Sequence, residues 1–98
     1  MMNYQKINQA TAYVSSEKSG FLMAKLSRHF SHKIDVQYTE KATVMTFSIG
    51  VCKIFIEKNL LRIECASPSV DELKELMDVI KSHFDRFASK EGVTVTWS

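Results

Sequence analysis

Three histidines have the residue type and spacing that best suit chemistry in this sequence. His29 follows Leu26 by three residues and His83 follows Ile80 by three, so each flanks an apolar helical stripe. If the two helices lie side by side, these imidazoles approach each other and, with a cysteine, could hold a metal ion. The sequence offers no CxxC, HExxH or clustered carboxylates to complete such a site.

We therefore favour partly buried histidines that bond to backbone groups, with His32 capping the carbonyls at a helix end. This interpretation predicts no metal, no cofactor and no catalytic residue. The alternative that stays open is a metal- or small-ligand-binding enzyme that uses His29, His32 and His83.

A second candidate is an anion-binding edge made of Lys33, Arg86 and Arg28. Against it, Arg28 and Lys33 lie at the expected end of a helix, where backbone carbonyls disfavour anions. The candidate ligand-binding residues are His29, His32, Lys33, His83 and Arg86.

Cys52 and Cys65 are predicted to face each other on neighbouring strands. A disulfide or a thiol pair fits that geometry. We favour two reduced thiols packed in an apolar core, because a catalytic cysteine needs an exposed, electropositive setting.

Composition limits the class of protein. The 98 residues suit one domain, residues 1–98, and 45% hydrophobic with 24% charged residues is ordinary for a globular chain. A net charge of +2 is too small to indicate nucleic acid, and no apolar run is long enough for a membrane span. Residues 1–8 form a polar lead-in without the apolar region of a secretory signal, so we expect a reducing cytoplasm.

Two amphipathic helices must position the histidines. The longer runs from Ser69, which with Glu72 forms a capping box, to Gly92. Its apolar stripe consists of Leu73, Leu76, Met77, Ile80, Phe84, Phe87 and Ala88. The shorter helix begins after Ser15 or Ser16 and ends near Ser31. Its stripe is Leu22, Met23, Leu26 and Phe30.

Strands with a period of two account for much of the remaining chain. They cover residues 9–15, 34–39, 44–49, 52–57 and 60–65, and a last short strand is expected at 94–97. Two-residue turns at 40–41, 49–50 and 58–59 predict the register. Ile34, Phe47, Cys52 and Cys65 then lie in one cross-strand row, and Val36, Met45, Ile54 and Ile63 in the next.

The expected fold is α+β: a two-layer sandwich with an antiparallel sheet and two helices on one face. The element order β-α-β-β-β-β-α(-β) matches TATA-binding-protein-like topology. On the outer face of the sheet, Val44 should oppose Phe55, with Leu60 and Arg62 close by. Such a spot suits a partner or dimer surface, although single exposed apolar residues are also normal.

Two stretches carry a family resemblance. Phe30-x-His32-Lys33 ends the first helix, and His83-Phe84-Asp85-Arg86-Phe87-Ala88 lies in the second. Together with Gly50-Val51-Cys52 and Val95-Thr96-Trp97 they resemble a bacterial family, domain of unknown function 2218. The resemblance implies an association with flavin-dependent, siderophore-interacting ferric reductases, and hence an accessory role in iron uptake.

We therefore expect a small, cytoplasmic, non-enzymatic binding module, either monomer or homodimer. A siderophore reductase is its expected protein partner, with no nucleic acid and no membrane. The alternative to a protein partner is a homodimer joined through the outer sheet face or through the Trp97 strand.

Overall fold

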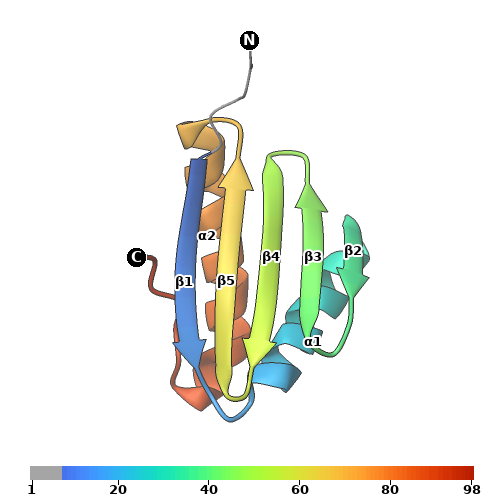
Figure 1. The fold of residues 1–98 in the computed structure, drawn as a ribbon, viewed down its shortest axis with the longest axis vertical. Coiled ribbons are helices and arrows are strands. Elements are labelled where there is room, and N and C mark those ends of the chain that lie inside the picture. Colours follow the sequence, from blue (N-terminus) through green and yellow to red (C-terminus); the bar gives the residue numbers. More distant parts are fainter. Residues whose placement is uncertain (1–7) are drawn as a thin grey trace.

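The computed structural model describes residues 8–98, so most of the predicted lead-in, residues 1–7, lies outside the described part. The predicted order of helices and strands is confirmed (Figure 1). The elements are β1 (Asn8–Ser15), α1 (Ser19–Ser31), β2 (Asp35–Tyr38), β3 (Ala42–Phe47), β4 (Gly50–Glu57), β5 (Leu60–Ser67) and α2 (Val70–Ala88), followed by a 3₁₀ turn (Ser89–Glu91). The five-stranded antiparallel sheet has the order β1-β5-β4-β3-β2.

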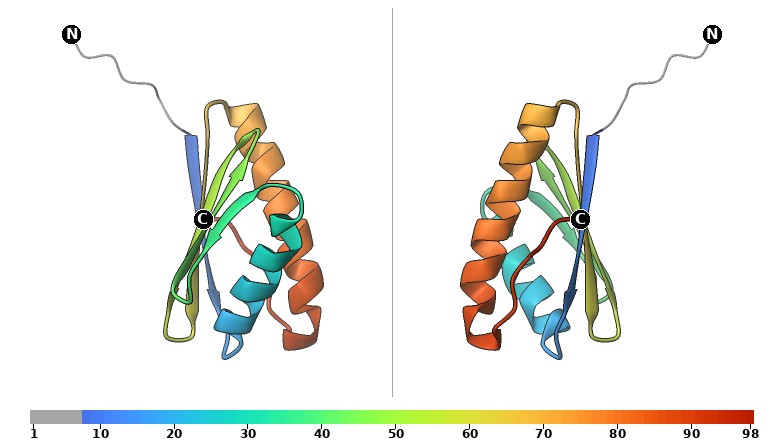
Figure 2. Two further views of the ribbon diagram at one scale, coloured as in Figure 1. Left: turned by 90° about the vertical axis from the view of Figure 1, so that its right-hand side faces the viewer. Right: turned by 90° about the vertical axis from the view of Figure 1, so that its left-hand side faces the viewer.

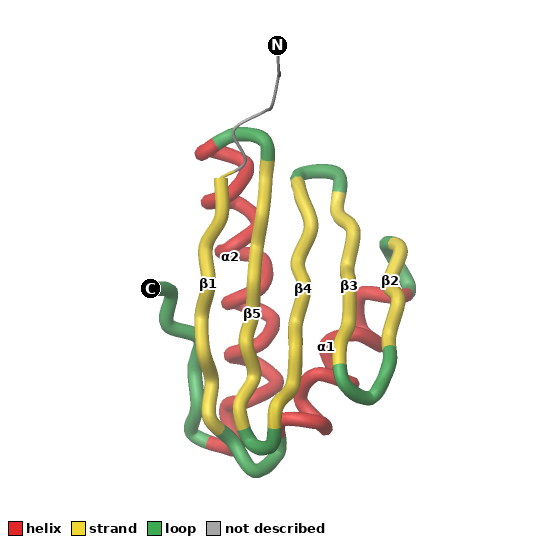
Figure 3. The backbone as a smooth tube through the Cα atoms, in the orientation of Figure 1, coloured by secondary structure: helices red, strands yellow, loops and turns green. Residues whose placement is uncertain are grey.

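Both helices lie on the same face of the sheet, which confirms the predicted two-layer α+β sandwich (Figures 2 and 3). The space between the layers is filled by the predicted stripes and by inward strand residues. Its largest fully buried apolar side chains are Leu22, Met23, Leu26, Met45, Ile54, Leu61, Ile63, Leu76, Ile80, Phe84 and Val95. No described element covers the other face of the sheet. Neither described helix is long and apolar enough to cross a membrane.

Helix α2 begins at the predicted cap. The Ser69 hydroxyl accepts a hydrogen bond from the Glu72 N–H at 3.1 Å and donates to the Glu72 carboxylate at 3.0 Å. After the 3₁₀ turn the chain leaves the helix at Gly92, whose φ of 70° is a left-handed conformation that favours glycine.

Helix α1 begins later than predicted. The Ser16 hydroxyl accepts from the Lys18 N–H at 2.9 Å, so it stabilises the preceding turn instead of capping the helix. Lys18 occupies the N-cap position, where no side chain caps the helix, and the first turn contains no acidic residue.

The predicted register is right for two strand pairs and wrong for the third. Val36 opposes Met45 and Cys52 opposes Cys65, as expected. Between β3 and β4, however, Met45 opposes Cys52 and not Ile54. The two-residue turn is at residues 48–49, whereas 49–50 was predicted. The resulting shift of two residues keeps every side chain on its predicted face.

The expected last strand is only partly present. Trp97 forms one isolated antiparallel bridge with Ala12, and the Ser98 N–H donates to the Thr11 carbonyl at 2.9 Å. Residues 97 and 98 therefore lie against β1 without forming a further strand, while Val95 is buried in the core.

Candidate functional site

The predicted approach of His29 and His83 occurs at the contact between α1 and α2. Their ring centroids are 5.1 Å apart. Phe30 lies 5.0 Å from the His29 ring and 4.9 Å from the His83 ring, and Phe87 lies 5.4 Å from His29. We call these four side chains the histidine cluster.

Hydrogen bonding differs between the two imidazoles. The His83 Nδ1 lies 2.7 Å from the Val79 carbonyl oxygen, so this nitrogen carries a proton and donates. The His29 Nε2 is buried without a hydrogen-bond partner. Burial first, and then the nearby charges of His83, Lys33 and Arg86, lower the pKa of His29 below its ordinary value. The neutral ring that results suits a packing role.

The histidine cluster does not supply a full set of metal ligands. Within residues 8–98, no group of three or more His, Cys, Asp or Glu side chains lies close enough to hold one metal ion. Two imidazoles fall short of the four ligands of a structural zinc site. The described side chains therefore offer packing and one unpaired ring nitrogen at this contact.

The remaining candidate ligand residues do not converge with the two histidines into one pocket. His32 is exposed at the end of α1, where its backbone N–H bonds to the Phe30 carbonyl. Lys33 is exposed in the turn that follows, and its N–H bonds to the same carbonyl. Arg86 lies on α2 and lines a cavity with Lys25, and Lys33 is not among the residues that line it.

Cys52 and Cys65 are free, buried and directly opposite each other on β4 and β5. A hydrogen bond with Cys65, together with burial, raises the pKa of the Cys52 thiol well above its ordinary value. A protonated, enclosed thiol is a poor nucleophile.

The predicted partner surface lies on the open face of the sheet, but its pairing differs from expectation. Phe55 opposes Arg62 and Ala42, whereas Val44 opposes Lys53 and not Phe55, because of the shifted β3–β4 turn. Leu60 lies on this face next to the turn between β4 and β5, opposite Glu57.

A cross-strand row that includes three large side chains and one alanine spans four strands of that face. Its members are Tyr13, Arg62, Phe55 and Ala42, which we call the Tyr13 row. The Arg62 guanidinium carbon lies 4.6 Å from the Phe55 ring centroid, and its Nε is 2.9 Å from a Glu64 carboxylate oxygen. The contact between Arg62 and Glu64 is an ion pair, but its geometry does not meet the criteria of a hydrogen bond. Tyr13 is 56% exposed, so an apolar ring faces solvent beside an ordered arginine.

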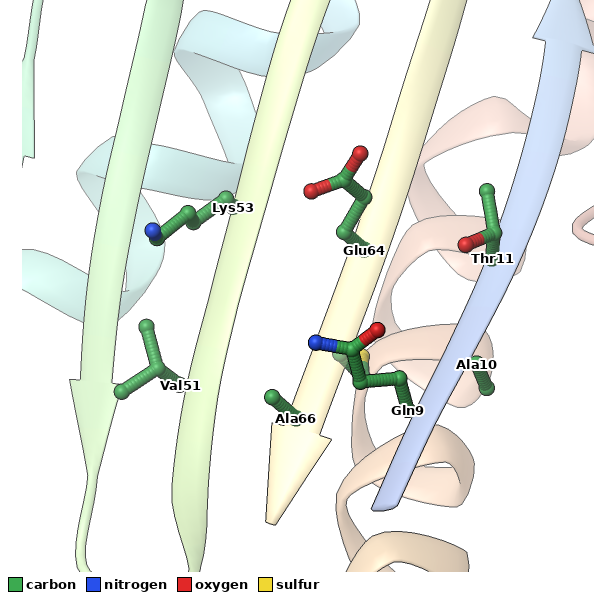
Figure 4. Close-up of a pocket in the computed structure, with 8 residues that line it drawn as sticks. Gln9, Ala10, Thr11, Val51, Lys53, Glu64 and Ala66 are labelled. Atoms are coloured by element: carbon green, nitrogen blue, oxygen red, sulfur yellow. The ribbon is translucent and has the colours of Figure 1, made fainter. Parts of the chain in front are cut away.

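Beside the Tyr13 row lies a shallow cavity of about 150 Å³ (Figure 4). Lys53 of β4 and Glu64 of β5 stand at one end of it, and Val51 and Ala66 at the other. Gln9 of β1 reaches across β5. The cavity has the size of a small side chain, not of a substrate.

Comparison with known sequences decides the family. Residues 11–98 match the family described as "Uncharacterized protein conserved in bacteria (DUF2218)". The chain belongs to the DUF2218 family. A search of curated proteins found no match. Among solved structures, the NMR structure of PA4090 from Pseudomonas aeruginosa is similar, with a TM-score of 0.75 and 23% identity over 92% of this chain and 94% of that one. This likeness shows the fold alone.

The stretches that carried the DUF2218 resemblance come together in the structure. Phe30 of the first stretch and His83 and Phe87 of the second belong to the histidine cluster. The first stretch ends α1 and the second forms the C-terminal half of α2. These residues therefore have a common structural role in joining the two helices.

Sequence reasoning missed two arrangements. Lys81 and Asp85 lie outside the predicted apolar stripe of α2, at positions typical of a solvated face, yet both bond to the C-terminal segment. Phe21 and Lys25 were not singled out, yet they line a cavity with Arg86. The sequence offered one signal for this arrangement: Phe21 and Lys25 are four residues apart, so their side chains are neighbours on one helix face. The residue type alone does not show whether a phenylalanine is exposed or buried.

Proposed function

We propose that this DUF2218 chain is a small, non-enzymatic binding module that recognises a protein partner through the open face of its sheet. The Tyr13 row is the observation that carries this proposal. Tyr, Phe and Arg are the side chains enriched at the centres of protein interfaces. Here Arg62 is already held against Phe55, so less side-chain entropy is lost on binding.

The edges of the sheet are less suited to binding than its face. Residues 97 and 98 bond to β1 along one edge. At the other edge β2 has only four residues, so it offers few groups for strand addition.

The family resemblance, and not the geometry, supplies the partner and the setting. We propose a flavin-dependent siderophore reductase as partner, an accessory role in siderophore-iron utilisation, and a cytoplasmic location. Two free, buried cysteines are consistent with a reducing compartment.

A titration of the ¹⁵N-labelled chain with a purified siderophore-interacting reductase tests the proposal. We expect amide shifts on β1, β4 and β5 around the Tyr13 row. Phe55→Asp should weaken binding by about tenfold or more, because a charge at the interface centre must be desolvated. The matched control is Ser82→Asp, which adds the same charge to an exposed position on α2.

Other results would replace the proposal. Unchanged binding by Phe55→Asp would exclude the sheet face. If the chain alone sediments as a dimer, and Phe55→Asp makes it monomeric, a second copy is the occupant. Turnover of a substrate by the chain alone, lost in His83→Ala, would favour the histidine-based enzyme.

A further inference from the structure

A second surface, on the helical layer, has the features of a small-molecule site. It is an open cavity of about 500 Å³ between the beginning of α1 and the end of α2. These two helix ends lie next to each other at the same end of the molecule (Figure 2). Ligand sites in proteins commonly have volumes of about 300–1,000 Å³.

Positive charge is concentrated in this cavity. Lys18, just before α1, and Lys25 of α1 line it on one side, and Arg86 and Lys90 on the other, against a single carboxylate, Glu91. The whole chain carries a net charge of only +2, so the excess of cations here is local. An anion would find several donors within one cavity.

The start of α1 adds to this preference. Lys18 is the N-cap residue, no side-chain cap is present, and no acidic residue lies in the first turn. The positive end of the helix dipole at the rim of the cavity is therefore not offset by a carboxylate within the first turn. The carbonyl end of α2 has the opposite effect, but Arg86 and Lys90 lie next to it.

Aromatic rings form the apolar part of the cavity. Phe21 is 57% exposed, and Phe87 is half-buried and makes a T-shaped contact with His29. The Lys25 Nζ lies 5.6 Å from the Phe21 centroid and 5.2 Å from the Phe87 centroid. An ammonium group held between two rings can contact an anion while the rings contact an apolar body.

We propose that this cavity binds a small aromatic anion, namely an aryl ring that carries a phosphate or a carboxylate. The ring packs on Phe21 and Phe87, and the anionic group is held by Lys25 and Arg86. This site is separate from the open sheet face, so either one can be disproved without the other.

Three probes separate the two parts of the proposed recognition. Phenyl phosphate has both a ring and a charge, inorganic phosphate has only the charge, and benzyl alcohol has only the ring. In ¹H–¹⁵N titrations at constant ionic strength, phenyl phosphate should shift amides of Phe21, Lys25 and Phe87. It should bind about tenfold tighter than either other probe. A fourth titration, with benzoate, shows whether carboxylate or phosphate is preferred.

Variants then assign the roles. Lys25→Gln should weaken phenyl phosphate binding by about fivefold or more, and Lys25→Arg should restore most of it. Phe21→Ala, at an exposed position, should remove the preference for phenyl phosphate over inorganic phosphate. The control, Lys74→Gln, removes an exposed lysine from the first turns of α2 and should leave binding unchanged.

Three results would overturn the proposal. One is equal binding of phenyl phosphate and inorganic phosphate by the wild-type chain. Another is amide shifts confined to the outer sheet face. The third is unchanged binding in both Lys25→Gln and Phe21→Ala, with each variant folded by its NMR spectrum.

Discussion

His29 shows how much of a site can be predicted at the scale of one residue. Its place on the flank of an apolar stripe, matched by His83, was enough to predict that the two rings meet, and their centroids are 5.1 Å apart. The absence of a partner for its Nε2 could not be predicted, because that depends on how Phe30 and Phe87 close around the ring.

The lowered pKa of His29 leads to a prediction about stability and pH. Its pKa lies below the ordinary 6.5 in the folded chain, so the unfolded chain binds the proton more readily. The free energy of unfolding should be highest above pH 6.5 and should fall as the pH drops through the lowered pKa. His29→Phe should flatten this dependence, as measured by urea unfolding between pH 8 and pH 5.

His32→Gln is the comparison for that experiment, because His32 is exposed and is the smallest of the causes that lower the pKa of His29, so its replacement should change the pH dependence less than His29→Phe does. An unchanged pH dependence in His29→Phe would mean that another group is responsible.

Gly50 gives a second prediction at this scale. A Cβ there would overlap the Ser67 hydroxyl and the Ala66 carbonyl oxygen. Gly50→Ala should therefore lower the free energy of unfolding by about 1–3 kcal/mol, through displacement of β5. Gly20→Ala provides the contrast, since its Cβ would lie 3.8 Å from Ile56 Cδ1. It should raise stability by up to about 1 kcal/mol. Equal effects of the two variants, in chemical denaturation, would contradict the argument.

At the scale of elements, periodicity predicted the type and order of the helices and strands, but not the contacts that two charged side chains of α2 make. Lys81 and Asp85 occupy helical positions that face away from the stripe, which is typical of a solvated surface. In the structure the Lys81 Nζ donates to the Asp85 carboxylate at 2.7 Å and to the Val95 carbonyl at 2.9 Å. The return path of residues 93–98 depends on tertiary packing, so helical spacing alone could not show these bonds.

The position of the β3–β4 turn was predicted wrongly for a similar reason. Both Ser48-Ile49 and Ile49-Gly50 fit a short connection between the same two alternating segments. A shift of two residues leaves the apolar face intact, so alternation cannot choose between them. In the structure the turn is at Ser48-Ile49, and Gly50 lies within β4 close to β5.

The contact between α2 and the C-terminal segment predicts a response to acid. Burial raises the pKa of Asp85, but hydrogen bonds from Lys81, the Val95 N–H and Thr94 outweigh it and hold the pKa below 3.8. The stabilisation is therefore present above pH 3.8 and is lost as the pH falls through the lowered pKa. At pH 7, Asp85→Asn should cost about 1–2 kcal/mol.

The measurement is chemical denaturation of Asp85→Asn and wild type at pH 7 and at pH 2.5, where the difference between the two should be smaller than at pH 7. Asp78→Asn, at an exposed position on the same helix, should match wild type at both pH values. A difference for Asp85→Asn that persists undiminished in acid would exclude the ionised carboxylate as the cause.

The whole molecule has two different surfaces around one core. The sheet and both helices bury the same set of side chains, and the two candidate binding surfaces lie on opposite layers. The sequence predicted this division because period-two strands expose alternate residues and amphipathic helices bury one face. It did not predict which exposed positions form a cavity, since a cavity arises where two helix ends meet in space.

One shared core should make unfolding cooperative, and Trp97 allows a test. This single tryptophan packs against the core from the C-terminal segment, far from α1 in the sequence. Urea unfolding followed by Trp97 fluorescence and by far-ultraviolet circular dichroism should give the same midpoint.

Ile80→Ala should lower the free energy of unfolding by about 2–5 kcal/mol with both probes, because Ile80 is fully buried between the layers. Lys74→Ala, at an exposed position on the same helix, should change it by less than about 0.5 kcal/mol. A fluorescence transition that precedes the dichroism transition would show that residues 93–98 detach before the core unfolds.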